Sequence, residues 1–587
     1  MTPLAPAVVA QSEPGRLRFD LSGPVLALFA TLLVVLVVLP IAWIAIFAFS
    51  TKDGIATIAN FATVFGDPAF QEPLLTTLVI AVSVGVICCL MAAPMGWLVA
   101  RSDMPGRRLV RTLVTASFVT PPFLGAIAWE LLAAPNSGLL NQAWRAIAGA
   151  PSDEYLFNIY SLGGVIFVIS CYTFPYVFVL VTNALDRIPG ELEDASSMLG
   201  ARSWQTARRI TIPMALPAIL AGALIAFLQA MNLFGSPAIL AIPAGFHTMT
   251  TKIWSLFQFP PKPELAAAAA LPLLVLTVVL LRAQSAILGR RNYAVLGSKY
   301  GAPRPVPLGP LRWLALALCL GLLMLPVFLP YGALFNAAFS KVPSQLITWS
   351  NLSMHNVHFT FFELSQTWGV MRNTFLLATL AGTLGTLLAL VIAYLVARQA
   401  VRGHRVLGFL ATAPIAIPGI VLGVGLFLAY TRPWLSIAGI DVPPMILYGT
   451  LWILLIAYLT IELPASYQQL GSAIQAVHPE LEEASRILGA TRVRALREIT
   501  APLLLSGVVA TWCFIFVAVV RELSAAVILF TSDTKVLSVL IFDLKESGDH
   551  GAIAVLGLVM LAITTLVVGL ANLIPGAGGA TRLRAGG

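Results

Sequence analysis

Long apolar runs separated by short polar segments organise the whole chain. A membrane-spanning helix needs about 20 predominantly apolar residues. Twelve runs approach or exceed this length, at residues 24–49, 74–100, 112–134, 159–184, 214–234, 265–288, 313–339, 374–397, 407–430, 446–469, 503–520 and 551–573. The pattern predicts an all-α polytopic membrane protein with about twelve transmembrane helices. The first run is longer than the apolar core of a cleavable signal sequence, so we expect it to be an anchor.

Prolines interrupt two of these runs. Pro121 and Pro122 lie in the third run, and Pro414 and Pro418 lie in the ninth. Breaks of this kind are tolerated inside a membrane where neighbouring helices or cavity water satisfy the freed carbonyl groups. Packing explains them, and a position along a transport path is the alternative.

The basic residues indicate the orientation. With both termini in the cytoplasm, the cytoplasmic segments hold 24 of the 35 Lys and Arg residues, the outer loops hold 10, and Arg282 lies within the sixth run. Cytoplasmic loops of membrane proteins carry an excess of Lys and Arg. We therefore expect a multi-pass protein of the bacterial inner membrane with both termini in the cytoplasm.

The second part of the chain repeats the first. Residues 191–213 read ELEDASSMLGARSWQTARRITIP, and residues 480–502 read ELEEASRILGATRVRALREITAP, with 12 of 23 positions identical at a constant offset of 289. Such repetition indicates duplication of a six-span unit, in two parallel repeats. The predicted organisation is a cytoplasmic tail (1–23), a first half (24–288), a cytoplasmic linker (289–312), a second half (313–573) and a C-terminal tail (574–587).

Each repeated segment has the features of a short helix that ends in a tight turn. Acidic residues come first, which is favourable at a helix N-terminus. Small residues follow, and they leave one face low enough for close docking. Gly200 and Gly489 then end the helix, because glycine readily adopts the left-handed conformation. A short basic helix leads to Pro213 or Pro502 at the entry of the next span.

These segments resemble the EAA loop of ABC importer permeases, in which Glu-Ala-Ala is followed by a Gly and then by a Pro. Asp replaces Glu in the first copy, and Ser replaces the second Ala in both. The resemblance implies the type I ABC importer permease fold, with each loop forming a coupling helix that seats in a groove of the ATP-hydrolysing subunit. The residues that it assigns to coupling are Glu193, Asp194, Ala195, Ser196, Gly200, Ala201 and Pro213, and Glu482, Glu483, Ala484, Ser485, Gly489, Ala490 and Pro502.

The partners follow from what the chain lacks. It has no GxxxxGK[ST] phosphate-binding motif, so we expect it not to be an enzyme and to hold no cofactor. ATP and Mg²⁺ would be bound by a separate ATPase subunit, in two copies because there are two loops. A periplasmic binding protein would deliver the substrate. With 58% hydrophobic and 10% charged residues and a net charge of +9, the basic clusters between the runs indicate topology anchors and not nucleic-acid binding.

Two further stretches suggest a substrate. Residues 521–557, RELSAAVILFTSDTKVLSVLIFDLKESGDHGAIAVLG, and residues 292–309, NYAVLGSKYGAPRPVPLG, resemble the fused permeases of the ferric-iron importer family. This resemblance favours Fe(III). Relatives with the same two-half layout import thiamine, phosphonates such as 2-aminoethylphosphonate, polyamines or sugar phosphates, and these substrates stay open as alternatives.

Charged residues near the membrane are the candidates for the translocation path or its mouth. Buried ionisable groups are costly in a bilayer, so each is a functional candidate. Glu130 and Glu462 lie within apolar runs, and Arg521 and Glu522 lie at the end of the eleventh run, aligned with Asn232 and Leu233. We place Asn232, Glu462, Arg521 and Glu522 at the path. The alternatives are a local ion-pair network for Arg521 and Glu522, and for Glu462 a bond to freed backbone beside Pro464.

We expect no metal site. The five cysteines lie inside apolar runs, and His355 and His358 are the only close histidine pair, whereas a zinc site would need more ligands. Two other classes compete with an importer. A secondary transporter of the major-facilitator type also has twelve spans in two repeats, but it needs no ATPase. A membrane-embedded enzyme would need a catalytic motif that is missing from the sequence.

Overall fold

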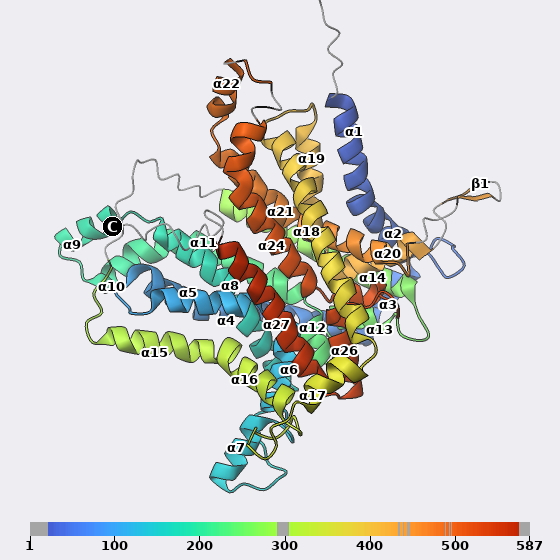
Figure 1. Ribbon diagram of the computed structural model, residues 1–587. Coiled ribbons are helices and arrows are strands. Elements are labelled where there is room, and N and C mark those ends of the chain that lie inside the picture. Colours follow the sequence, from blue (N-terminus) through green and yellow to red (C-terminus); the bar gives the residue numbers. More distant parts are fainter. Residues whose placement is uncertain are drawn as a thin grey trace, which may run out of the picture.

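The chain is almost entirely helical, as the computed structural model shows (Figure 1). The structure describes residues 22–289, 305–431, 435–437, 440–442, 447–487, 489–491, 494 and 496–573. Residues 1–21 of the predicted N-terminal tail (1–23), the predicted C-terminal tail (574–587) and most of the predicted linker (289–312) lie outside these residues. The predicted all-α class is confirmed, with one small antiparallel hairpin in addition, in which Ser436 pairs with Asp441.

The predicted number of spans is confirmed. Within the described residues, ten helices are long and apolar enough to cross a membrane, and two bent helix pairs raise the number to twelve. Several helices begin before the apolar run that predicted them. The eighth span, for example, begins at Thr367 and not near residue 374, so that Arg372 lies inside its helix.

Prolines break the third and ninth spans, at the positions where the sequence places them. α5 (Arg107–Val119) and α6 (Pro122–Ala133) meet at an angle of 98°. In the second copy, the segment that ends in the 3-10 turn at Ala416 and the helix that starts at Gly419 meet at 109°. Proline lacks an N–H group and disfavours a helical conformation of the residue before it, so both helices stop and restart in a new direction.

We refer to residues 22–289 as the first half. Its elements are α1 (Ser22–Leu33), the π-turn η1 (Val34–Val38), α2 (Leu39–Ala48), α3 (Ala59–Gly66), α4 (Pro68–Arg101), α5, α6, α7 (Leu139–Ala148), α8 (Leu162–Asp186), α9 (Gly190–Met198), α10 (Ser203–Thr206), η2 (Ala207–Thr211), α11 (Ile212–Asn232), α12 (Gly235–Leu240), α13 (Met249–Ser255) and α14 (Pro263–Gly289).

Residues 305–573 are referred to as the second half. Its elements are α15 (Leu311–Leu323), η3 (Met324–Phe328), α16 (Leu329–Phe339), α17 (His355–His358), η4 (Phe359–Glu363), α18 (Thr367–Ala397), α19 (His404–Thr412), η5 (Ala413–Ala416), α20 (Gly419–Thr431), β1 (Leu435–Ile437), β2 (Ile440–Val442), α21 (Leu451–Ala476), α22 (Pro479–Ile487), η6 (Leu496–Thr500), α24 (Ala501–Val520), α25 (Ala526–Leu529), α26 (Leu537–Ser547) and α27 (His550–Leu573).

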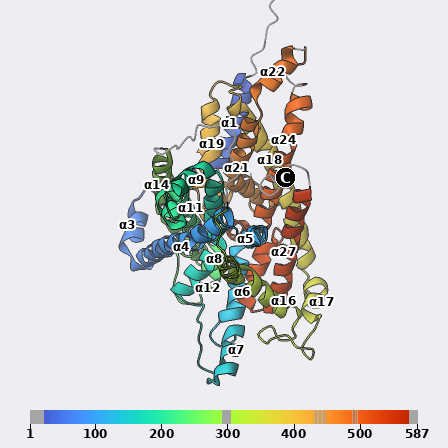
Figure 2. The same cartoon turned by 90° about the vertical axis from the view of Figure 1, so that its left-hand side faces the viewer.

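The first span of each half packs against the other half. α1 lies beside α19 of the second half in both Figure 1 and Figure 2, and α2 packs on α14 of its own half and on α20 of the other. The second copy repeats this arrangement, because α16 packs on α27 and on α6. A π-turn precedes α2 and another precedes α16, each beside a proline (Pro40 and Pro330). This exchange of first spans joins the two halves into one body.

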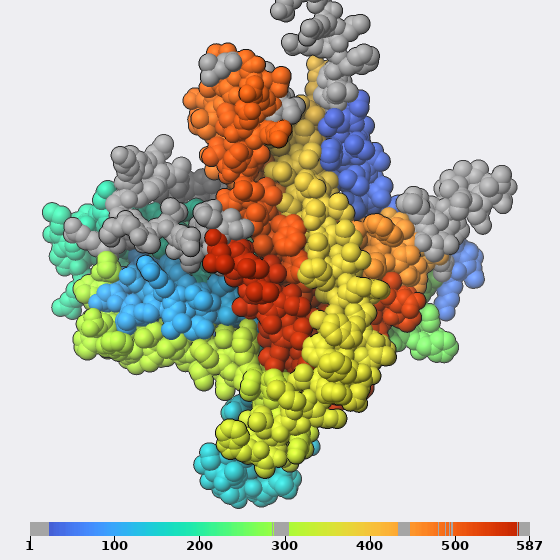
Figure 3. All heavy atoms as spheres, in the orientation of Figure 1, coloured from blue at the N-terminus to red at the C-terminus, as the bar shows by residue number. Residues whose placement is uncertain are grey.

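The two repeated loops lie away from the centre of the molecule. In Figure 1, α9 is at the left edge and α22 is at the upper edge, whereas α7 is at the lower edge. Figure 3 shows α22 projecting from the body of the molecule. Each loop follows the fourth span of its half, and α7 follows the third span of the first half. Because successive spans alternate in direction, we expect both loops on one side of the membrane, which we call the loop side, and α7 on the opposite side.

The crossing of α2 over α20 depends on a glycine. A Cβ atom on Gly425 would lie 2.7 Å from the carbonyl oxygen of Pro40 and 2.9 Å from its Cβ. We expect Gly425→Leu to lower the free energy of unfolding by about 1–3 kcal/mol, the usual cost of overpacking, and to lower the thermal midpoint measured in detergent. The matched control is Gly332→Leu in α16, where a Cβ meets nothing within 4 Å. Equal midpoints for the two variants would contradict the crossing.

Candidate functional site

The two repeated loops form similar short helices that end in the same turn. α9 begins after Pro189 with Glu191 and Glu193 in its first turn, and α22 has Glu480 and Glu482 in its first turn. Carboxylates are favourable there because the helix N-terminus carries partial positive charge. Sequence and structure therefore agree on where each loop helix begins.

Glycine ends each helix as predicted. Gly200 has φ of 80° and Gly489 has φ of 92°, a region that residues with a Cβ rarely adopt. The N–H of Ala201 donates to the carbonyl of Ser196 at 3.1 Å, and the N–H of Ala490 donates to that of Ser485 at 3.1 Å. This six-residue bond is the Schellman turn. No atom lies within 4 Å of a Cβ built on either glycine, so the backbone conformation, and not crowding, requires glycine here.

Both loops expose apolar side chains. Met198 and Leu199 are 88% and 89% exposed, and Ile487, which aligns with Met198, is 85% exposed. No residue of α9 is buried. Trp204, on the helix after Gly200, is 68% exposed. Apolar side chains that cluster on a polar loop mark a contact surface. The acidic, small and glycine residues of the loops were predicted from the sequence, but these apolar ones were not.

A buried arginine ties the first loop to the spans. Arg101, at the end of α4, is fully buried, and its Nη1 atom lies 3.5 Å from Oε2 of Glu193. Its Nη2 atom donates to the carbonyl of Ile188 at 2.8 Å, and the hydroxyl of Thr211 donates to Oε1 of Glu193 at 2.9 Å. We call Arg101, Glu193 and Thr211 the first clamp. Glu193 therefore faces the membrane-embedded body and not the exposed side of the loop.

The second loop is held in the same way. Nη2 of Arg398 lies 3.2 Å from Oε1 of Glu482 and donates to the carbonyl of Val477 at 2.9 Å. The hydroxyl of Thr500 donates to Oε1 of Glu482 at 2.9 Å, and that of Tyr394 donates to Oε2 at 3.4 Å. We call Arg398, Glu482 and Thr500 the second clamp. Both clamps join the end of the second span of a half to the start and end of its loop.

Sequence reasoning missed the two arginines, although a signal exists. The tetrapeptide Leu-Val-Ala-Arg occurs at 98–101 and again at 395–398. Its offset is 297, whereas the loops repeat at 289, because the second half is eight residues shorter (297 − 289) between these points. A search at one constant offset therefore aligns the loops and misses the arginines.

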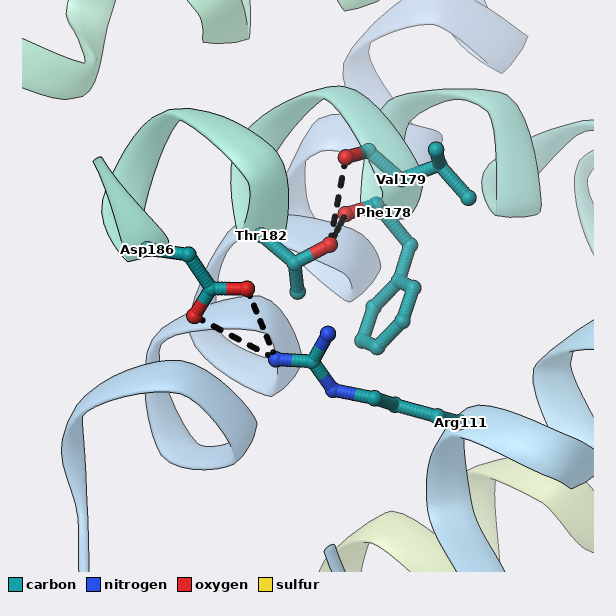
Figure 4. A network of polar contacts seen from close by, with 5 residues as sticks. All are labelled: Arg111, Phe178, Val179, Thr182 and Asp186. Carbon is teal, nitrogen blue, oxygen red and sulfur yellow. Dashed lines mark hydrogen bonds and ion pairs between the residues drawn. The ribbon is translucent and has the colours of Figure 1, made fainter. Parts of the chain in front are cut away.

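The first half has one more ion pair at this end. Arg111 of α5 approaches both carboxylate oxygens of Asp186 at the end of α8, at 3.0 and 3.3 Å (Figure 4). Thr182, one turn earlier, bonds back to the carbonyls of Phe178 and Val179 of its own helix. The aligned residues of the second half are Gly408 and Gln475. Because the pair is about one-third exposed on both sides, it contributes little to stability.

Three of the predicted path residues lie where α11 and α24 end, near the contact between the halves, and Glu462 lies within α21. A Cβ on Gly235, at the start of α12, would lie 3.3 Å from Leu523 of the second half. Arg521 donates to the carbonyl of Phe118, and its guanidinium lies 5.1 Å from the centre of that ring. The aligned Asn232 has a buried Oδ1 atom without a hydrogen-bond partner within the described residues.

The two glutamates of this group differ in their contacts. Glu522 accepts bonds from the N–H groups of Ala525 and Ala526 at 2.9 and 3.2 Å and so caps α25. Burial raises the pKa of Glu522 to about 7, and these backbone bonds oppose the rise. No hydrogen bond to the carboxylate of Glu462 is present within the described residues. The hydroxyl of Ser466 instead bonds the carbonyl of Glu462 at 2.8 Å.

The halves are joined by an ion pair on the side opposite the loops. Nζ of Lys545, at the end of α26, lies 2.6 Å from Oε1 of Glu130 in α6. The hydroxyl of Tyr160 donates to the same oxygen at 2.6 Å. Glu130 is 6% exposed and Lys545 is 18% exposed. The position in the second half that aligns with Glu130 is Phe427, whose ring packs 5.3 Å from that of Phe257. One of the two equivalent contacts is therefore ionic and the other is aromatic.

No group of three or more His, Cys, Asp or Glu residues could hold a metal ion in the part of the chain that the structure describes. The Nδ1 atom of His358 lies 3.0 Å from Glu363, and both side chains are more than half exposed. Cys88, Cys171 and Cys319 are buried as free thiols.

A family model described as "Binding-protein-dependent transport system inner membrane component" matches residues 92–292 and 381–575. Both stretches include a loop and its clamp arginine. The match occurs twice, which agrees with the predicted duplication.

Individual relatives point the same way. The chain is 27% identical to the ferric transport system permease protein FbpB of Actinobacillus pleuropneumoniae over 77% of its own length and 63% of that protein. It is 21% identical to the Fe(3+)-transport system permease protein FbpB 2 of Haemophilus influenzae over 92% of its length and 96% of that protein. It is 31% identical to the sulfate transport system permease protein CysW of Synechocystis sp. over 44% of its length and 88% of that protein.

The clamps generate a prediction. Glu193→Ala leaves the buried guanidinium of Arg101 without its carboxylate, which costs on the order of 3 kcal/mol, so the first loop should open more often. Because about 1.4 kcal/mol is a factor of ten in an equilibrium constant, we expect trypsin to cut at Arg208 and Arg209 on the order of a hundredfold faster than in the unchanged protein. The matched control is Glu191→Ala, which removes an exposed carboxylate from the same helix. Equal cleavage rates in the two variants would contradict the anchoring role.

Proposed function

Because this chain belongs to the family of binding-protein-dependent transport system inner membrane components, we propose that it is the transmembrane permease subunit of an ATP-driven ABC importer, with both halves of the permease in one chain. A separate ATPase subunit would bind ATP and Mg²⁺, and a periplasmic binding protein would deliver the substrate. The chain is a multi-pass protein of the inner membrane. We propose that the loop side, and with it both termini, faces the cytoplasm.

The exposed apolar residues of the two loops carry this proposal. A loop that faced only water would gain nothing from Met198, Leu199 and Ile487 at more than four-fifths exposure. A groove on a partner would bury them. Because the loops occur in two copies with the same turn and the same clamp, the proposal requires two copies of the ATPase, one for each loop.

The clamps explain how motion of such a partner would reach the spans. Glu193 and Glu482 bind arginines at the ends of α4 and α18, so a loop cannot shift without shifting a span. The two loop helices also contain Asp194, Ala195 and Ser196, and Glu483, Ala484 and Ser485. Ala201 and Ala490 follow the glycines and close the turns. Pro213 and Pro502 lie in the first turn of α11 and α24 and begin the spans that end at the path residues.

We propose Fe(III) as the substrate. Two relatives that are ferric transport permeases support this proposal. Arg521 contacts Phe118 of the first half, and we assign it to the path together with Asn232, Glu462 and Glu522. The carboxylates of Glu462 and Glu522 beside the guanidinium of Arg521 suit a transient contact with the substrate. Tight binding at this place would slow release of the substrate. The alternatives are 2-aminoethylphosphonate, thiamine, polyamines and sugar phosphates, and a secondary transporter is the remote one.

The docking proposal predicts the effect of charge on the loops. Met198→Asp and Ile487→Asp place carboxylates in the apolar contact, so each should reduce co-purification of the ATPase subunit about tenfold, and the double variant should abolish it. Ile147→Asp is the matched control, because Ile147 of α7 is also 88% exposed but lies on the opposite side. Loss of the ATPase in the control, or its retention in the double variant, would contradict the proposal.

The substrate proposal is tested in proteoliposomes that contain the chain, its ATPase and its binding protein. We expect ATP-dependent uptake of Fe(III) that a tenfold excess of 2-aminoethylphosphonate or thiamine leaves unchanged. Uptake of one of those compounds, with none of Fe(III), would replace the substrate and keep the importer. Uptake by the chain alone, without ATP, would establish a secondary transporter instead.

A further inference from the structure

A pocket opens on the membrane-facing surface of the second half, between three spans. Its volume is about 300 Å³, and it is lined by Trp368, Arg372 and Phe375 of α18, Phe516 and Val520 of α24, and Ile563 of α27. Figure 3 shows α18 and α27 side by side on this face of the molecule. This volume lies at the lower end of the range for small-molecule sites.

Arg372 is the one charged residue of this lining. Its side chain is exposed, and no hydrogen bond, ion pair or ring contact joins it to another residue within the described part of the chain. The other polar lining residue, Thr374, is satisfied, because its hydroxyl donates to the carbonyl of Val370 and accepts from the N–H of Leu537, both at 2.8 Å. The pocket therefore presents one cation above an otherwise apolar interior.

The position of Arg372 along the span places it near the membrane surface. It lies five residues inside α18, or about 7.5 Å from the helix start at Thr367 at 1.5 Å per residue. Trp368, one turn earlier, is 60% exposed, and its indole N–H donates to the carbonyl of Phe361 at 2.9 Å. Tryptophan in this setting is typical of the belt at the membrane–water interface. Arg372 is thus level with lipid headgroups, on the side opposite the loops.

A cation at this depth needs an anion. An unpaired guanidinium in contact with hydrocarbon is costly, and the abundant anion at this level of a bilayer is the lipid phosphate. The planar guanidinium fits phosphate with two parallel hydrogen bonds, and the apolar pocket below Arg372 suits an acyl chain. We propose that this pocket is a binding site for an anionic phospholipid, with the phosphate on Arg372 and one acyl chain against Phe516 and Ile563.

The first half shows that the fold does not require this cation. The residue that aligns with Arg372 at the offset of 297 is Leu75, which is 61% exposed, and Gln71 aligns with Trp368. Both halves build the same span, and only the second carries the arginine and the tryptophan. Arg372→Leu therefore reproduces a side chain that the fold already accepts at the equivalent place.

The test uses the full chain, reconstituted in nanodiscs of phosphatidylglycerol and then stripped with detergent. Native mass spectrometry counts the retained lipids. We expect the unchanged chain to retain one more phosphatidylglycerol than Arg372→Leu, and Arg372→Lys to retain an intermediate amount. Val520→Trp, which fills the pocket and leaves Arg372 in place, should also lose the lipid. Equal thermal midpoints of the stripped variants establish that folding is unaffected.

Three outcomes would overturn the proposal. Equal retention of phosphatidylglycerol by the unchanged chain and Arg372→Leu would show that Arg372 holds no lipid. Binding of inorganic phosphate with the same Arg372 dependence and equal strength would indicate a phosphate site that makes no use of the pocket. Retention of neutral diacylglycerol in equal amount by both chains, together with loss in Val520→Trp, would indicate an acyl-chain site without headgroup recognition.

Discussion

The cost of a buried charge determines much of this structure. Arg101 is fully out of contact with solvent, at the end of a long apolar helix, and a guanidinium in such a place needs a carboxylate and further acceptors. Glu193 supplies the carboxylate and Ile188 supplies one carbonyl acceptor, both from the segment that follows a different span, whereas Nε and Nη1 of Arg101 form no hydrogen bond within the described residues. The same requirement applies at Arg398. The two loops, which would otherwise be attached to the spans only through their ends, are thereby fixed to the spans.

Much of the fold could be predicted because it depends on local physics. Apolar runs of sufficient length give spans, prolines give the breaks in the third and ninth spans, and Gly200 and Gly489 give the left-handed turns, each from a few neighbouring residues. The angles of 98° and 109° at the breaks could not be predicted, because the packing of other helices sets them. The same limit applies to the clamps, whose members lie about ninety residues apart and follow two different offsets.

The candidate site divides along the same line. The acidic and small residues of the loops were identified from the sequence, yet Glu193 and Glu482 turn inwards, whereas the exposed surface consists of Met198, Leu199 and Ile487. An apolar residue between polar ones carries no signal of its own until its exposure is known. The two halves also differ where chemistry matters. The clamps are the same in both halves. However, the first half has Asn232 at the position that aligns with Arg521, and Leu75 at the position that aligns with Arg372. The two repeats therefore share the clamps that hold the loops and differ in the polar residues elsewhere.

The contact between Glu130 and Lys545 has a consequence for water. The pair is nearly dry, joins the two halves, and takes a further hydrogen bond from Tyr160. If the halves part on this side, a carboxylate and an ammonium group are left apart, and each then needs hydration. Separation of the halves and hydration of Glu130 and Lys545 must therefore happen together, so that this contact either excludes water or is fully hydrated. At Phe257 and Phe427, the equivalent contact has no ion to hydrate, so water would enter first at the ionic contact and the halves would separate from that side.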